Sequence, residues 1–208
     1  MTGYSDRINH ALAFAAKHHD QQVRRGTRLP YLTAAPNVAV ILSRYDRDDD
    51  TVVSGVLRDV VQDYVRDGFS VEMLEARIGE KFGAPVLAAL LAVVERRYDP
   101  DGVEMTPEER RTDLVNRLAA ADERGRWVIA AVVAHSAGTL LADLTRTSFP
   151  GTVWAHAIDG AGRDTTMQWF HAVHQRLEAA GFAAPIMTEL GEMLAALGER
   201  SAQAERRA

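Results

Sequence analysis

The sequence predicts an all-α protein with one helical domain. Apolar residues recur at intervals of three and four along most of the chain, and helix-capping residues stand directly before several of these segments. No segment shows the alternation of apolar and polar residues that is typical of a β-strand. The chain has 208 residues, 47% of them hydrophobic, so it can bury a sizeable core. No repeat or linker divides it, and we expect a single domain over residues 1–208.

Capping residues define the expected helices. Ser5 and the acidic run at residues 46–50 can cap helices, and the TPEE motif that begins at Thr106 has the spacing of a capping box. Gly83 is typical of a residue just past a helix C-terminus. The segment from Trp127 is apolar on all sides, which predicts a central helix. We expect helices at 5–18, 37–44, 51–65, 70–83, 84–97, 106–122, 127–146, 164–180 and 185–198, irregular chain at 147–162 and a frayed tail at 199–208.

Composition limits the possible functions. The net charge of -5 argues against duplex nucleic acid or an anionic membrane as a partner. Because cysteine is absent, disulfides, thiolate nucleophiles and metal sites with sulfur ligands are excluded. The N-terminus has no signal-peptide pattern, and no segment approaches the roughly 20 apolar residues of a membrane span. These observations predict a cytoplasmic protein that binds neither nucleic acid nor a membrane.

The stretch GVLRDVVQDY, residues 55–64, combines an apolar helical stripe with a polar cluster. The cluster consists of Arg58, Asp59, Gln62 and Asp63. One interpretation is a solvated helix face. Another is an ion pair of Arg58 with Asp59 or Asp63, two carboxylates that share a face of the helix because they are four residues apart. Such a pair would either be structural, inside the bundle, or take part in a functional site.

Three stretches follow, in order and spacing, the pattern of one family. They are FAAKHHDQQVRRGTRLPYLT at 14–33, GVLRDVVQDY at 55–64 and VIAAVVAHSAGTLLADL at 128–144. Together they resemble the HD-domain phosphohydrolases, in the branch that contains hydrolases of the alarmones guanosine tetraphosphate and pentaphosphate. The likeness is strongest over residues 10–180 and implies an HD-domain helical bundle of about eight helices.

The resemblance implies a divalent metal site, but this chain departs from the family's ligand set. His19 matches the first ligand and Asp59 matches the aspartate of the His-Asp pair. Alanine at residues 34–35, Arg58 and Val132 stand where the family has its other ligands. Two ligands are too few for a catalytic cation, and Arg58 adds a permanent positive charge. We therefore predict that the metal site is lost, so that the protein has no metal cofactor; the alternative is a retained manganese ion.

Further family positions bear on catalysis and ligand binding. The catalytic glutamate is replaced by Gln62, which cannot act as a general base, whereas Asp63 is kept. Basic residues and one histidine match positions that line the family's cleft, where guanidinium groups bind anions without a metal. Their alternative interpretation is ordinary surface charge for the arginines and core packing for the histidine. These residues are Arg24, Arg25, Arg110, Arg111 and His135.

Three functions are compatible with these residues. The first is a degenerate HD-domain protein that has lost metal-dependent phosphohydrolase activity and binds an anionic small molecule or a protein partner. The second is a metal-independent enzyme that uses His19, Arg58, Asp59 and Asp63 for acid-base chemistry. The alternative interpretation of His19 is a hydrogen-bonded core or cleft residue. The third is a phosphohydrolase of a nucleotide or other phosphate ester that works through an unexpected ligand set.

Overall fold

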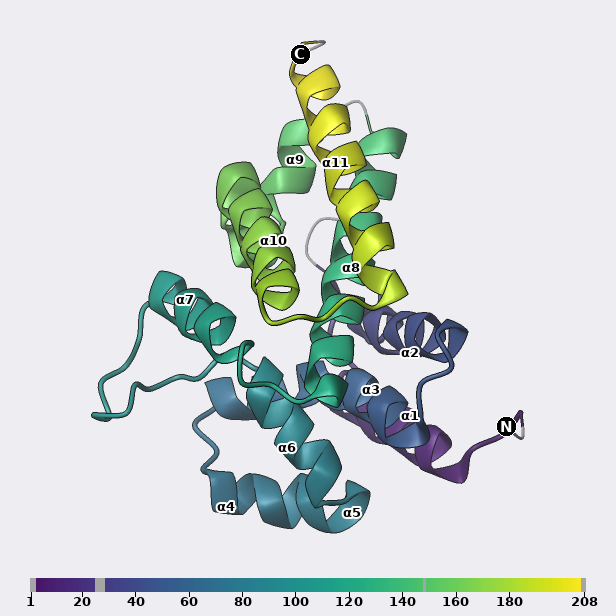
Figure 1. Ribbon diagram of the computed structural model, residues 1–208, viewed down its shortest axis with the longest axis vertical. Helices are drawn as coiled ribbons and strands as arrows, with labels where there is room; N and C mark the ends of the chain where they lie inside the picture. Colours follow the sequence, from purple (N-terminus) through teal and green to yellow (C-terminus); the bar gives the residue numbers. More distant parts are fainter. Residues whose placement is uncertain (1–2, 25–28, 148, 207–208) are drawn as a thin grey trace.

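A computed structural model describes residues 3–24, 29–147 and 149–206, and this part of the chain consists of helices joined by loops, without β-strands (Figure 1). The predicted all-α class is confirmed. Outside the helices, backbone pairing in these residues is limited to two isolated bridges, Val23 with Pro30 and Tyr98 with Glu104. The α-helices are α1 (Asp6–His18), α2 (Ala34–Arg44), α3 (Asp49–Arg66), α4 (Val71–Leu74), α5 (Glu80–Phe82), α6 (Ala84–Val93), α7 (Pro107–Arg117), α8 (Glu123–Arg146), α9 (Pro150–Ala155), α10 (Gly162–Ala179) and α11 (Pro185–Glu205).

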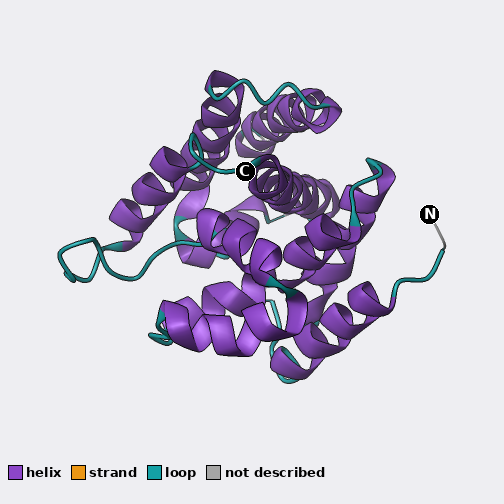
Figure 2. Cartoon of the chain, turned by 60° about the horizontal axis from the view of Figure 1, so that its bottom comes forward, coloured by secondary structure: helices purple, strands orange, loops and turns teal. Residues whose placement is uncertain are grey.

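Two helices form the centre of the protein. Helix α3 packs against α1, α2, α6 and α8, and it is buried along most of its length. Helix α8 continues past this group and packs most extensively against α11, with α10 and α9 also in contact. Figure 1 shows α11 lying along α8 at the top, while α1, α2, α3 and α6 gather around its lower end. Viewed from below, the long loop between α6 and α7 projects away from the helices (Figure 2).

The predicted caps are present at the helix starts. The side chains of Ser5 and Asp48 accept hydrogen bonds from the backbone amides of the first turns of α1 and α3. Thr106 and Glu109 form the expected reciprocal capping box at the start of α7. Gly83 ends α5 with a φ of 101°, a conformation that favours glycine. Local sequence signals therefore set these boundaries.

Other boundaries differ from those that the sequence predicts. Helix α6 ends at Val93 instead of reaching residue 97, and α7 ends at Arg117 instead of residue 122. Helix α9 forms inside the segment that was expected to be irregular. The predicted frayed tail is wrong up to Glu205, because α11 continues past residue 198 and buries Ser201.

Helix α8 also corrects an expectation about membrane segments. By length and composition it is apolar enough to cross a membrane, although the sequence led us to expect no such segment. Half of its apolar window is buried inside the protein. Since a buried core helix has the same composition, packing against α2, α3, α6 and α11 accounts for its apolar residues.

Glycine is required where α2 approaches α3. A Cβ atom at Gly55 would lie 2.6 Å from Leu42 Cδ1 and 2.9 Å from Val38 Cγ1, and both neighbours are buried. These distances are too short for real Cβ contacts. The small residue therefore allows the two helices to lie close together.

We expect Gly55→Ala to lower the free energy of unfolding. Overpacking a filled core costs about 1–3 kcal/mol. This cost exceeds the roughly 1 kcal/mol that alanine gains in helix propensity, because the buried neighbours cannot move away. Urea denaturation measures the difference. Gly151→Ala is the matched control, because a Cβ there meets no atom within 4 Å. A Gly55→Ala protein as stable as the wild type would contradict the close approach.

Candidate functional site

Helix α3 carries a stripe of polar residues on an otherwise buried helix. The stripe lines a cavity of about 940 Å³. Its members are related by spacings of three and four residues, which place them on one side of the helix. They are Arg58, Asp59, Gln62, Asp63 and Arg66. The polar cluster of the sequence thus forms part of the wall of a cavity.

Arg58 and Asp59 form an ion pair within this stripe. Arg58 Nη1 donates a hydrogen bond to Asp59 Oδ1 at 3.0 Å. The two side chains are 13% and 25% exposed, so the pair is largely withdrawn from water. Of the two carboxylates that the sequence offered as partners, Arg58 therefore uses Asp59.

Gln62 has a structural role that the sequence did not predict. Its side-chain amide spans the backbone of Glu95 just beyond α6: Nε2 donates to the carbonyl oxygen at 3.3 Å, and Oε1 accepts from the amide at 2.8 Å. A glutamate could not donate the first of these bonds when ionised. Arg117 completes the end of α6 by donating to the carbonyl oxygens of Leu91, Ala92 and Val94. These two side chains explain why α6 ends at Val93, because they satisfy carbonyl and amide groups that a longer helix would have paired.

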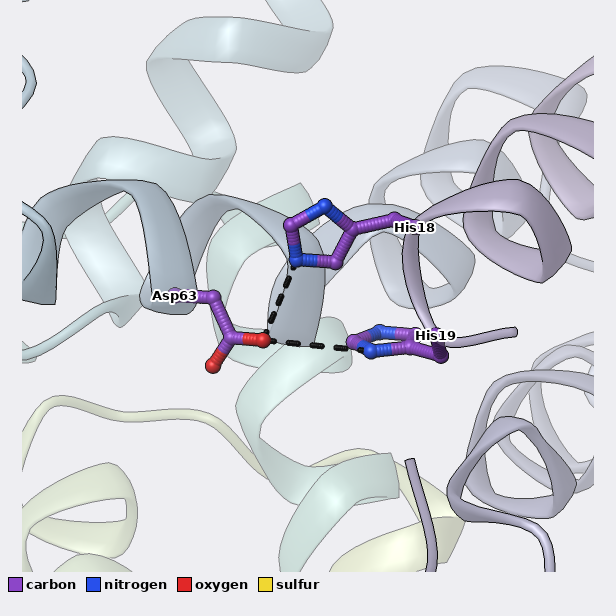
Figure 3. Close-up of side chains that lie close together, drawn as sticks. All are labelled: His18, His19 and Asp63. Atoms are coloured by element: carbon purple, nitrogen blue, oxygen red, sulfur yellow. Dashed lines mark hydrogen bonds and ion pairs between the residues drawn. The ribbon is translucent and has the colours of Figure 1, made fainter. Parts of the chain in front are cut away.

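Asp63 faces two histidines at the end of α1 (Figure 3). His18 Nε2 lies 3.1 Å from Asp63 Oδ2, and His19 Nδ1 lies 3.8 Å from the same oxygen. His18 is the last residue of α1 and His19 its C-cap, with φ -98° and ψ 16°. The helix ends between them, and both rings can therefore reach one carboxylate although the residues are adjacent.

The two histidines differ in their surroundings. His18 lines the cavity, whereas His19 is 3% exposed and is absent from the lining. His19 Nδ1 also lies 2.9 Å from Gln22 Oε1. His19 is thus a hydrogen-bonded, buried residue beside the site. The family pattern points to His19, but His18 is the histidine that lines the cavity, and the sequence did not predict this.

The basic residues that the sequence singled out, as far as the structure describes them, all lie at the same cavity. Arg24, Arg110 and Arg111 line it, and Arg25 lies outside the described residues. Arg110 Nη2 forms an ion pair with Glu104 Oε1 at 3.5 Å, and Arg110 Nε donates a hydrogen bond to the carbonyl oxygen of Met105. Within the described part of the chain, Arg24 and Arg111 have no ion pair with a carboxylate. Their guanidinium groups are half-buried and available to a ligand.

Electrostatics in the cavity affect His135 and Tyr31. The pKa of His135 is lowered, first because the ring is buried and then because Arg24 repels the protonated form; Asp59 acts in the opposite direction. The pKa of Tyr31 is raised, first by the negative charge of Asp59 and then by burial. Both side chains are therefore held neutral beside the charged residues of α3.

The residues at the family's metal positions do not match what a divalent cation needs. Ala34, Ala35, Arg58 and Val132 all line the cavity, as the resemblance implies, but none is a metal ligand. The remaining carboxylate, Asp59, already accepts a hydrogen bond from Arg58. These positions therefore present a fixed positive charge and one hydrogen-bonded carboxylate where the resemblance implies metal ligands.

Comparisons with known proteins agree with the helical architecture. A family model described as HD domain matches residues 11–137. A solved structure of a metazoan ortholog of SpoT, which hydrolyses ppGpp and plays a role in starvation responses, is 24% identical, with a TM-score of 0.67 over 93% of this chain and 96% of that chain. The crystal structure of lmo0812 from Listeria monocytogenes EGD-e is 21% identical, with a TM-score of 0.61 over 77% of this chain and 96% of that chain. At these identities the two structures share the fold alone. No curated protein matches the sequence.

The pKa of His135 can be tested by NMR titration of its imidazole signals. We expect it to lie below the ordinary value for histidine and to rise in Arg24→Ala, since this change removes a nearby positive charge. Arg44→Ala removes the same charge from an exposed position on α2 and should leave the titration unchanged. An identical response to both substitutions would contradict the assigned cause.

The role of Gln62 can be tested by Gln62→Glu. At neutral pH we expect the free energy of unfolding to fall by about 1–3 kcal/mol, the cost of leaving a buried acceptor unpaired. Because burial raises the pKa of the introduced carboxyl group, and the protonated group can donate again, stability should recover as the pH falls. Chemical denaturation at two pH values measures this. Gln175→Glu, at an exposed position of α10, is the control; equal effects of both changes would rule out the proposed contact.

Proposed function

Since the chain belongs to the HD-domain family, we propose that it is a member that binds an anionic small molecule in the α3 cavity and does not hydrolyse it through a metal ion. The observation that carries this proposal is the hydrogen-bonded pair of Arg58 and Asp59. Metal-dependent hydrolysis needs a cation that activates water and polarises phosphate oxygens. Arg58 instead supplies a fixed positive charge in the cavity without that chemistry.

The arrangement of cationic side chains supports an anionic ligand. Five arginines and four carboxylates are among the described residues that line the cavity. One arginine is paired with Asp59, and Arg110 is held by Glu104. Arg24 and Arg111 approach from separate parts of the chain, the loop after α1 and helix α7, and can bind opposite ends of an anion by bidentate hydrogen bonds.

The size of the cavity and the family point to a nucleoside phosphate as the first ligand class to test. A volume of about 940 Å³ accommodates a ligand as large as a nucleotide. One protein of similar fold is described as hydrolysing ppGpp. A protein partner and a cytoplasmic location stay predictions from the sequence.

A second candidate function is metal-independent acid-base catalysis. It is favoured by the hydrogen bond between His18 Nε2 and Asp63 Oδ2, since a carboxylate that orients an imidazole is a common arrangement for a general base. In this version His18 takes the role that the sequence assigned to His19. Arg58 and Asp59 then position the substrate.

Ligand binding can be tested with the purified full chain in the presence of a chelator. We expect mass spectrometry to detect a copurifying anionic compound, and calorimetry with guanosine phosphates to give measurable binding without turnover. Arg24→Ala and Arg111→Ala should each weaken binding by about 10- to 100-fold, which corresponds to the loss of a hydrogen bond to a charged group.

Arg44→Ala is the control for these substitutions, because Arg44 is an exposed arginine of α2 that does not line the cavity. Turnover in the presence of chelator that is lost in Asp63→Asn would support the second candidate instead. Manganese-dependent hydrolysis by the wild-type protein would refute the proposed function.

A further inference from the structure

The ring nitrogens of His18 and His19 and a carboxylate oxygen of Asp63 form a compact group of metal-ligand atoms. The three atoms lie within 4.8 Å of one another (Figure 3). From this geometry we infer a binding site for a divalent transition metal, such as zinc. This site shares only His19 with the family's metal position, and it does not use Arg58, Asp59 or Val132.

Two of the three distances between these atoms are close to those that a metal imposes, and all three are within 4.8 Å. With zinc–nitrogen and zinc–oxygen bonds of about 2.0–2.1 Å in a tetrahedron, two ligand atoms lie about 3.3 Å apart. The distance from His18 Nε2 to Asp63 Oδ2 is 3.1 Å, and that from His19 Nδ1 is 3.8 Å. Small rotations of the side chains therefore bring the three atoms into coordinating positions.

The chemistry of the ligands selects the kind of metal. Two imidazoles and one carboxylate suit zinc, cobalt, nickel or iron, whereas magnesium and calcium prefer oxygen ligands. Three protein ligands leave at least one coordination position for water or another molecule. His18 and Asp63 line the cavity, so this position faces the space in which the anionic ligand is proposed to bind.

The surroundings of the site permit binding. The hydrogen bond of His19 Nδ1 to Gln22 must be given up, because a protonated ring nitrogen cannot bind a metal. Gln22 is exposed, and its amide can turn to water instead. The positive charge of Arg58 is offset by its partner Asp59, and this reduces the repulsion of a nearby cation.

Metal titration of the full chain tests this inference, with zinc followed by calorimetry and cobalt by its visible absorption. We expect one metal ion per chain, and at least a tenfold loss of affinity in both His18→Ala and Asp63→Asn. Asp59→Asn, which alters the family's metal position but none of the three ligands, should lower the affinity less than either of these substitutions, because it only leaves the charge of Arg58 uncompensated. His171→Ala is the control: it removes an exposed histidine that does not belong to this group, and it should leave the metal affinity unchanged.

Absence of stoichiometric binding in the wild type would overturn the inference, as would binding that survives His18→Ala or is lost in Asp59→Asn. Because a variant could fail to fold, broadening of the His18 and His19 imidazole NMR signals by cobalt provides a second measurement on the unmodified chain. Signals that stay sharp while cobalt binds would also overturn it. Anion binding in chelator is measured separately, so the proposed function can fail or hold independently of this site.

Discussion

The burial of helix α3 is the constraint on which the rest of the site depends. Four helices surround α3, and its apolar residues fill the space between them. Polar side chains on such a helix must share one face and satisfy one another, since unpaired charges in a protein interior are costly. Arg58 with Asp59, Gln62 with the backbone beyond α6, and Asp63 with His18 form such contacts. The same residues therefore shape the cavity and stabilise the bundle.

The end of α6 shows how closely scaffold and site are connected. Gln62 from α3 and Arg117 from α7 satisfy its backbone groups, and burial lowers the pKa of the Arg117 guanidinium while its contact with Asp113 opposes this effect. Gln62 thus stands at a catalytic position of the family while it holds two helices together. A change of the side chain at this position alters both the chemistry of the cavity and the packing around it.

The sequence predicts those features of the fold that depend on local signals. Ser5, Asp48 and Thr106 begin helices where their capping side chains predict, and the apolar segment from Trp127 lies at the centre. The end of α6 could not be predicted, because the side chains that satisfy it come from α3 and α7. Most of the residues expected from the family pattern line one cavity. The last turn of α1 decides which of two adjacent histidines reaches this cavity, and the pattern does not predict it.

The region matched by the HD-domain model stops at residue 137, in the middle of α8. Helices α10 and α11 follow that point, and α11 covers α8 more extensively than any other helix does. A fragment cut at the family boundary would lose this cover and present part of the chain's most apolar long helix to water. Exposed apolar surfaces of this kind cause self-association and adsorption to lipid. The cover of α8 thus comes from helices outside the matched region, and shortened fragments for biochemical work should keep α11.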